Sequence, residues 1–276
     1  MYRVLMCAAA ALFIGNQAVA QEKVSFPSTD GTTLTGYLYK PTGSGPFAAV
    51  VGPHGCDGLL GDSDNFLGKK GEIHPLYGQW GEILSRAGYM VLLVDSFQSR
   101  GHGSLCGFLP VETSPVLPYR EMPRDAFGGM NYLRSRPDVR PGSIAILGQS
   151  YGGNATMFTI ANGALPKDVP PEKDFRAAIV FYPGCVIILR RGQWGPRQPM
   201  LFLMGELDAT TAQCKEVIAK KEGGPPIDAH FYPNTYHAFD HPNLPPTVIT
   251  NGIAANPEAR ADAINRVTQF LSKQLP

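Results

Sequence analysis

The chain has 276 residues, of which 43% are hydrophobic and only 17% are charged, and its formal net charge is +1. This composition is that of a globular protein with a full core, and it excludes a disordered chain. Because the sequence contains no run of basic residues, it gives no sign of a nucleic-acid partner or of an anionic membrane surface.

The beginning of the chain differs in character from the rest. Arg3 is followed by the apolar stretch 4–14, and an Ala-Val-Ala tripeptide ends at Ala20. This pattern is typical of a secretory signal peptide that is cleaved after Ala20. A membrane anchor and a buried helix are the alternatives, but the apolar stretch is too short to span a bilayer. We therefore expect a periplasmic or secreted mature chain, residues 21–276, without a membrane span.

Short apolar segments alternate with helical ones along the mature chain. After a hairpin signal at Asp30-Gly31, the expected strands are 34–39, 48–52, 90–94, 144–148, 177–182, 200–205 and 229–232. The expected helices are 76–87, 122–136, 151–162, 210–221 and 258–274, and ordered loops are expected at 104–120 and 184–199. Most of the strands are apolar without a period of two, which indicates burial on both faces. The sequence predicts one α/β domain with a mostly parallel sheet and helices on both faces.

A G-x-S-x-G pentapeptide at residues 148–152 joins an expected strand to an expected helix. A serine in this context is the nucleophile of a strained strand-to-helix turn, where only residues without a Cβ fit beside it. The alternative is an ordinary turn with a serine that caps the helix. The strand before and the helix after favour Ser150 as a nucleophile.

A nucleophilic serine needs a base, and the base needs a group that fixes its tautomer. Two later loops supply the candidates in the order that this kind of turn requires. Asp208 is favoured as the acid over Glu206, which lies almost at the strand end. His237 is favoured as the base over His230, which lies within a strand, and over His241, which precedes a proline further along.

Two backbone N–H groups should stabilise the negative oxygen that forms when such a serine attacks a carbonyl. One is expected from Tyr151, directly after the nucleophile, and the other from Cys56 in the loop after the strand 48–52. His54 in the same loop is expected to be a structural hydrogen-bonding residue. Aromatic residues on the same side are candidates for the substrate pocket, although packing is their commoner role: Phe97, Tyr182 and Trp194.

Four cysteines remain after the signal peptide, an even number that suits an oxidising compartment. They lack the close spacing of a zinc site, and no metal or cofactor is expected. Cys56 and Cys106 follow two strands that should be neighbours, and Cys185 and Cys214 follow two others. We therefore predict the bridges Cys56–Cys106 and Cys185–Cys214, with four free thiols as the alternative.

The segments DGTTLTGYLYKP, HGCDG, GYMVLLVDSFQSRG, GQSYGG, GELDATT and YHAFD together resemble the dienelactone hydrolase family of α/β-hydrolases. The resemblance covers almost the whole mature chain. It implies the α/β-hydrolase fold, a triad of Ser150, Asp208 and His237, and oxyanion donors at Cys56 and Tyr151. Enzymes of the family that open dienelactones have a cysteine nucleophile and a glutamate in the early loop, where this chain has a serine and a glycine. The resemblance therefore implies the fold and hydrolase chemistry.

The sequence thus predicts an exported serine hydrolase that cleaves a small carboxylic ester through an acyl-enzyme. A peptidase or amidase with the same triad is one alternative. A non-catalytic exported binding protein on a hydrolase scaffold is the other. The natural substrate and the oligomeric state do not follow from the sequence.

Overall fold

The computed structural model describes residues 21–65, 68–107, 110–167, 169–247 and 252–276. The predicted signal peptide, residues 1–20, lies outside the described residues. No helix in the described ranges is long and apolar enough to cross a membrane.

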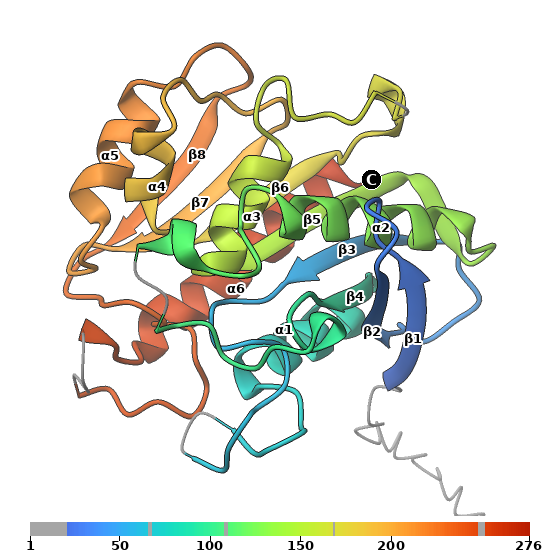
Figure 1. Ribbon diagram of the computed structural model, residues 1–276, viewed down its shortest axis with the longest axis horizontal. Helices are drawn as coiled ribbons and strands as arrows, with labels where there is room; N and C mark the ends of the chain where they lie inside the picture. The colour runs from blue at the N-terminus through green and yellow to red at the C-terminus, as the bar shows by residue number, and fades with distance from the viewer. Residues whose placement is uncertain (1–20, 66–67, 108–109, 168, 248–251) are drawn as a thin grey trace, which may run out of the picture.

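An eight-stranded sheet forms the centre of the molecule, with the strand order β1-β2-β4-β3-β5-β6-β7-β8 (Figure 1). The strands are β1 (Gln21–Pro27), β2 (Thr33–Tyr39), β3 (Phe47–Pro53), β4 (Met90–Asp95), β5 (Val139–Gln149), β6 (Ala177–Phe181), β7 (Met200–Gly205) and β8 (Ile227–Tyr232). The β1–β2 and β2–β4 pairs are antiparallel, and all other pairs are parallel. The predicted mostly parallel sheet is confirmed.

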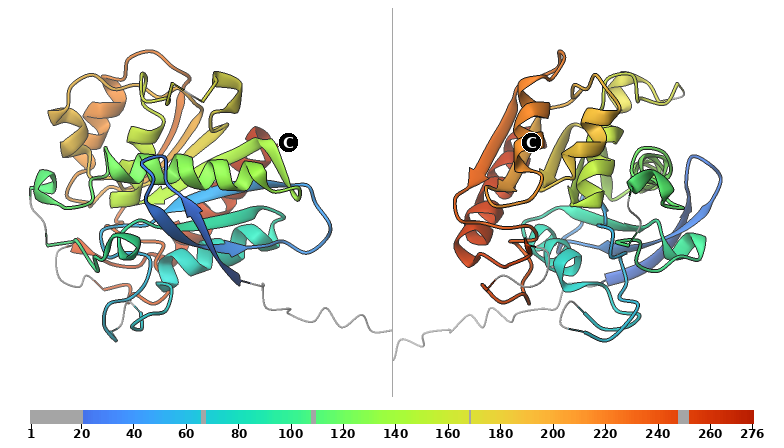
Figure 2. Two further views of the ribbon diagram at one scale, coloured as in Figure 1. Left: turned by 45° about the vertical axis from the view of Figure 1, so that its right-hand side comes forward. Right: turned by 60° about the vertical axis from the view of Figure 1, so that its left-hand side comes forward.

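Helices cover both faces of this sheet (Figures 1 and 2). The helices are α1 (Pro75–Arg86), α2 (Glu121–Ser135), α3 (Tyr151–Thr159), α4 (Cys185–Arg190), α5 (Thr211–Ala219) and α6 (Pro257–Gln274). On one face, α1 contacts α6 through a 2.9 Å hydrogen bond from Arg260 Nε to Gln79 Oε1. On the other face, α2 and α3 pack side by side.

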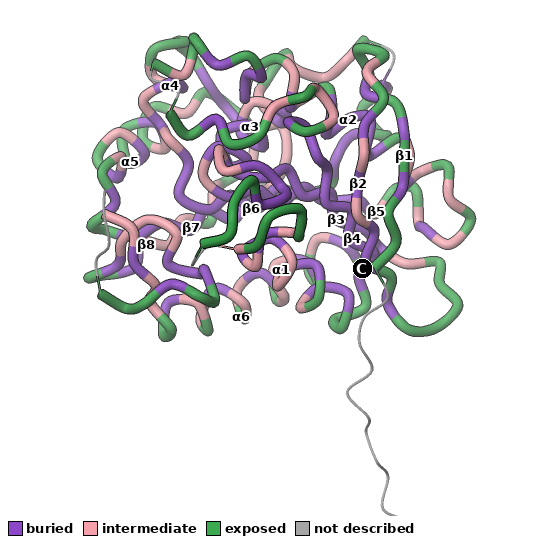
Figure 3. The backbone as a smooth tube through the Cα atoms, turned by 60° about the horizontal axis from the view of Figure 1, so that its bottom comes forward, coloured by how far each residue is buried: buried purple, intermediate pink, exposed green. Residues whose placement is uncertain are grey.

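Strand β4 shows why the apolar segments have no period of two. Leu93 lies beside Trp80 of α1, whereas Leu92 and Val94 lie against Gly129 of α2. Successive side chains therefore face different helical layers, and every position of β4 is buried. Figure 3 shows buried residues along the central strands β3, β4, β6 and β7, and exposed residues mainly in the connections.

Both predicted disulfides are present. Cys56 is bonded to Cys106 and Cys185 to Cys214, with Cα–Cα distances of 4.7 and 5.0 Å. The strands that precede the bonded cysteines are neighbours, as expected: β3 is next to β4, and β6 is next to β7 in the sheet. Each bridge therefore joins segments that follow the carboxyl ends of neighbouring strands, at the edge where the parallel strands present their loops.

Candidate active site

Ser150 occupies a strained turn between β5 and α3. Its backbone has φ 52° and ψ −116°, which is unusual for a residue with a side chain. The Ser150 N–H donates to the Phe181 carbonyl at 2.9 Å, which ties the turn to β6. A Cβ at Gly148 would lie 2.2 Å from the Gly152 oxygen, and one at Gly152 would lie 2.3 Å from the Pro53 oxygen. The two glycines are thus required by close backbone approach.

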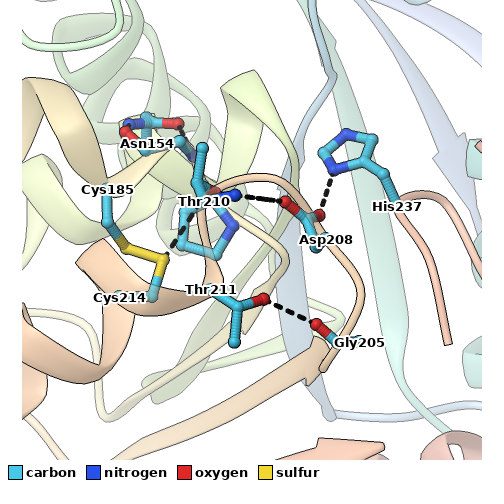
Figure 4. The surroundings of a disulfide bond; sticks show 10 residues. Asn154, Cys185, Gly205, Asp208, Thr210, Thr211, Cys214 and His237 are labelled. Carbon is cyan, nitrogen blue, oxygen red and sulfur yellow. Dashed lines mark hydrogen bonds and ion pairs between the residues drawn. A yellow bond between two sulfur atoms is a disulfide. The ribbon is translucent and has the colours of Figure 1, made fainter. Parts of the chain in front are cut away.

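Ser150, His237 and Asp208 form a continuous hydrogen-bonded chain. His237 Nε2 lies 3.0 Å from Ser150 Oγ, and His237 Nδ1 lies 2.5 Å from Asp208 Oδ2. The three residues come from loops after β5, β7 and β8, and Figure 4 shows the Asp208–His237 contact. The Asp208 side chain is 3% exposed and that of His237 is 29% exposed, so the base is accessible while the acid is covered.

The Asp208 carboxylate is held by donors on both of its oxygens. Oδ2 contacts His237, and Oδ1 accepts from the Thr210 N–H at 3.0 Å and from the Thr210 hydroxyl at 3.2 Å (Figure 4). Burial alone would raise the pKa of Asp208, but the hydrogen bonds from His237 and Thr210 lower that pKa below its usual value. The carboxylate is therefore ionised at neutral pH and fixed in orientation.

A buried polar network supports the loop that carries His237. The ring of Tyr182 packs against the His237 ring at 4.6 Å between centroids, and its hydroxyl donates to Asp240. Trp80 Nε1 donates to the same carboxyl group at 2.7 Å. Asp240 is fully buried, and this burial raises its pKa. This network joins residues far apart in the chain, and no local pattern in the sequence indicates it.

The loop after β3 is fixed on both sides of Cys56. The Gly55 N–H donates to the Tyr77 hydroxyl at 2.8 Å, and the Tyr77 hydroxyl donates to the Asp57 carboxylate. The Cys56 carbonyl accepts from the Leu105 N–H at 2.7 Å, next to the disulfide. Tyr77 thus holds the residues before and after Cys56, and its role is another feature that the sequence does not indicate.

His54 has the structural role expected of it. The Ser96 N–H donates to His54 Nε2 at 3.2 Å, so the ring proton is on Nδ1, which donates to the Gly55 carbonyl at 2.8 Å. Burial lowers the pKa of His54 to about 4. The imidazole is therefore neutral at physiological pH, and its two nitrogens bond to backbone groups of the loops after β3 and β4.

A cavity of about 490 Å³ opens in front of Ser150. The predicted oxyanion residues Cys56 and Tyr151 line it together with the three residues of the hydrogen-bonded chain. Its apolar wall is formed by aliphatic side chains and prolines, namely Pro110, Val111, Pro118, Val186, Ile187 and Ala209. Two further charged side chains lie in the lining, Glu112 and Arg190, whose charged atoms are 3.8 Å apart.

The three aromatic residues expected in the pocket are not among its lining residues, and this expectation is corrected. Phe97 is fully buried, with its ring 4.4 Å from that of His54. The ring of Tyr182 packs against the ring of His237, and Trp194 donates from Nε1 to the Met157 carbonyl at 3.0 Å. These large rings fill the core, and the apolar wall of the cavity comes instead from the short helix α4, the segment 110–118 and Ala209.

The Cys185–Cys214 bridge connects the α4 part of this wall to α5 (Figure 4). Cys185 is the first residue of α4, and Cys214 lies in α5 directly after the Asp208 loop. Asn154 of α3 exchanges two hydrogen bonds with the backbone of Gly184, at 2.9 and 2.7 Å. The start of α4 is thus tied to both α3 and α5. Among the described residues, no group of three or more His, Cys, Asp or Glu could hold a metal ion.

An eight-stranded, mostly parallel sheet covered by helices, with a serine at a glycine-flanked strand-to-helix turn, defines an α/β-hydrolase. The sequence profile of the dienelactone hydrolase family matches residues 79–275. The chain therefore belongs to the dienelactone hydrolase family. Among curated protein sequences, none matches the chain.

Several solved structures share the fold. A dienelactone hydrolase-like promiscuous phosphotriesterase from metagenomic libraries is 17% identical, with a TM-score of 0.65 over 94% of this chain and 100% of that one. Thermogutta terrifontis esterase 2, phosphoramylated by tabun, is 17% identical, with a TM-score of 0.60 over 92% and 94%. Porphyromonas gingivalis dipeptidyl peptidase 4 is 18% identical, with a TM-score of 0.61 over 94% of this chain and 36% of that one. At these identities the likeness shows the fold.

Proposed function

We propose that this protein is an exported serine hydrolase that cleaves a carboxylic ester through an acyl-enzyme. The observation that carries the proposal is the hydrogen-bonded chain from Ser150 through His237 to Asp208, which opens onto a cavity. A serine hydroxyl is a weak nucleophile by itself, and a histidine at 3.0 Å supplies the base that it needs.

The first half of the reaction forms the acyl-enzyme. Ser150 Oγ attacks the ester carbonyl carbon while its proton moves to His237 Nε2. The carbonyl oxygen becomes negative and accepts hydrogen bonds from the backbone N–H groups of Cys56 and Tyr151. Asp208 stabilises the imidazolium through Nδ1–H. When the intermediate collapses, the C–O bond to the alcohol breaks and His237 returns the proton to the leaving oxygen.

The second half releases the acid by the same route. A water molecule gives a proton to His237 and its oxygen attacks the acyl carbon. Collapse of this intermediate breaks the bond to Ser150, and the proton returns from His237 to the serine oxygen. The carboxylic acid leaves, and the site is restored without any other reactant.

Export belongs to the same proposal. The two disulfides are bonds that persist in oxidising compartments and are rare in the cytosol. Together with the leader pattern at residues 1–20, they support a periplasmic or secreted protein. Trypsin accessibility in intact cells and N-terminal sequencing of the purified protein test this part. A mature N-terminus at residue 21 is the expected result, and a retained leader on a protein recovered from the cytosol would contradict it.

The reaction is tested on the mature chain with p-nitrophenyl esters of graded acyl length and with the matching anilides. We expect ester hydrolysis that falls by about 10⁴–10⁶-fold in Ser150→Ala, while the melting temperature is kept. Preference for the anilides would indicate the amidase alternative. Equal activity of the variant and the parent would remove Ser150 as the nucleophile.

A further inference from the structure

A second hollow, separate from the catalytic cavity, lies where the start of α2 meets the end of α3. Its volume is about 500 Å³, and none of its lining residues is shared with the cavity in front of Ser150. Three arginines line it together with aromatic and small apolar side chains, and no lining residue is acidic. We call it the arginine hollow and define it by Tyr119, Arg120, Arg124, Phe158 and Arg191.

Two of its three guanidinium groups have no carboxylate partner among the described residues. Arg120 is neutralised by the adjacent Glu121. Arg191 instead lies over the face of Tyr119, with Cζ 3.7 Å from the ring centroid, and the side chain of Arg124 has no ion pair within the described ranges. Elsewhere Arg100 and Arg197 each bind a buried aspartate. The arginine hollow is therefore a place of unbalanced positive charge.

The arrangement suits an oxyanion. A guanidinium that is stacked on an aromatic face keeps its edge N–H donors free, and these bind carboxylate, sulfate or phosphate in a bidentate manner. Tyr119 is itself held by the edge of Phe158, at 5.7 Å between ring centroids. The ring of Tyr119 holds the Arg191 guanidinium in the lining of the hollow, and Arg124 joins the lining from the first turn of α2.

Two pairs of consecutive residues divide their side chains between the catalytic cavity and the hollow. Pro118 lines the cavity and the next residue, Tyr119, lines the hollow; Arg190 lines the cavity and the next residue, Arg191, lines the hollow. A substrate with its ester at Ser150 would have to extend past Pro118 to the end of α3, where Phe158 lines the hollow, to meet the unpaired guanidinium groups.

We propose that the arginine hollow binds an oxyanion carried on the remote end of the ester substrate. This inference rests on the proposed ester hydrolysis and narrows it to esters that bear a distant anionic group. Arg124 and Arg191 are the residues that recognise this group, and neither takes part in the chemical step.

The test compares two series of p-nitrophenyl esters of graded acyl length, one ending in a carboxylate and the other in the matching carboxamide. In the variant Arg124→Gln/Arg191→Gln, KM for the long carboxylate esters should rise about tenfold, the loss expected for charge-assisted hydrogen bonds. KM for the carboxamide esters, and kcat for both series, should change less than about twofold. Both arginines are exposed, so the fold should survive, and melting temperatures verify this.

Arg176→Gln is the matched control. Arg176 is also an exposed arginine without an ion pair among the described residues, but it precedes β6 and lies at the opposite edge of the sheet from the active site. This variant should leave KM for both series unchanged. An Arg124→Lys/Arg191→Lys variant, which keeps the charge but loses the fork of donors, should recover part of the affinity.

Inorganic phosphate at constant ionic strength separates a substrate subsite from a site for free anions. It should raise the apparent KM for the long carboxylate esters in the parent and have no such effect in the glutamine variant. An equal rise of KM for both ester series in the glutamine variant, or no rise for either, would overturn the inference. Phosphate binding that leaves the difference in KM between the carboxylate and carboxamide esters unchanged would also overturn the inference. These outcomes are distinct from failure of the proposed function, which would appear as hydrolysis that persists without Ser150.

Discussion

The two sides of the cavity are held in place by different means, although each has one disulfide. On the oxyanion side, the bridge includes Cys56 itself, and Tyr77 fixes the two residues that flank it. On the acid–base side, the Cys185–Cys214 bridge joins the cavity wall α4 to α5, and the polar contacts of Asp208 come from Thr210 and His237. The first bridge thus constrains a proposed catalytic amide directly, whereas the second constrains the substrate wall.

The largest expected effect lies on the acid–base side and concerns the choice of base. His237→Ala should lower ester turnover by about 10⁴–10⁶-fold, nearly as much as loss of Ser150, because residues of a triad act as a unit. His241→Ala should keep most of the activity, since His241 is buried and its Nδ1 accepts from the Asn243 N–H at 3.1 Å, whereas Ser150 Oγ is hydrogen-bonded to His237. Steady-state kinetics of both variants measure this difference. The reverse result would show that the base was chosen wrongly.

The two bridges should differ in their kinetic consequences. Replacing either cysteine pair with serines should cost at most about 4 kcal/mol of unfolding free energy, by chain-entropy arithmetic. Loss of Cys56–Cys106 should lower kcat, because the proposed oxyanion donor is released. Loss of Cys185–Cys214 should mainly raise KM, because Val186 and Ile187 of α4 line the cavity. Urea titration and ester kinetics check both points, and identical kinetic profiles would contradict the comparison.

Tyr77→Phe probes the oxyanion side without touching a cysteine. The ring stays, but the hydroxyl that bonds to Gly55 and Asp57 is lost. Loss of one oxyanion donor costs about 10²–10³-fold in kcat, so a donor that is only loosened should cost about tenfold. KM should remain within about twofold. Tyr39→Phe is the control, since this buried tyrosine lies on β2 and outside the cavity lining. A rise in KM with kcat unchanged would contradict the role of Tyr77.

The smallest expected effect is a pH dependence of stability that arises from Asp208. Its pKa is lowered in the folded state, so its contribution is present above the unfolded value of about 3.9 and is lost as the pH falls through the folded value. The parent should therefore be more stable than Asp208→Asn above about pH 5, and the two should converge in more acidic solution. Urea titrations across this range measure the difference. A difference in unfolding free energy between the parent and Asp208→Asn that grows as the pH falls would contradict this prediction.

The strands, the nucleophile turn and both disulfides could be predicted because each depends on local patterns or on the adjacency of consecutive strands. The part of the cavity wall that α4 forms could not be predicted in this way. The segment CVIILR is rich in branched apolar residues that give no clear helical signal, and it was expected as part of a loop. It forms α4 because the bridge at Cys185 and the packing against α5 decide its conformation.

Residues that support the site were missed for a related reason. Tyr77 is 20 positions from Asp57, and Tyr182 is 58 positions from Asp240. Nothing in the local sequence distinguishes a tyrosine that donates to a buried carboxylate from one that packs in the core. The pairing exists only after α1 has docked on the sheet and the loop after β8 has folded over β6. Such contacts are fixed by tertiary packing, which a single sequence does not reveal.

The proposed activation of Ser150 as the nucleophile can be measured directly. A fluorophosphonate probe reacts with serines that a neighbouring base has activated, and peptide mass spectrometry then locates the adduct. We expect one adduct per mature chain, on Ser150, with loss of ester hydrolysis in proportion to labelling and no adduct in His237→Ala. Labelling of a different serine, or full hydrolysis by a chain that is modified at Ser150, would contradict it.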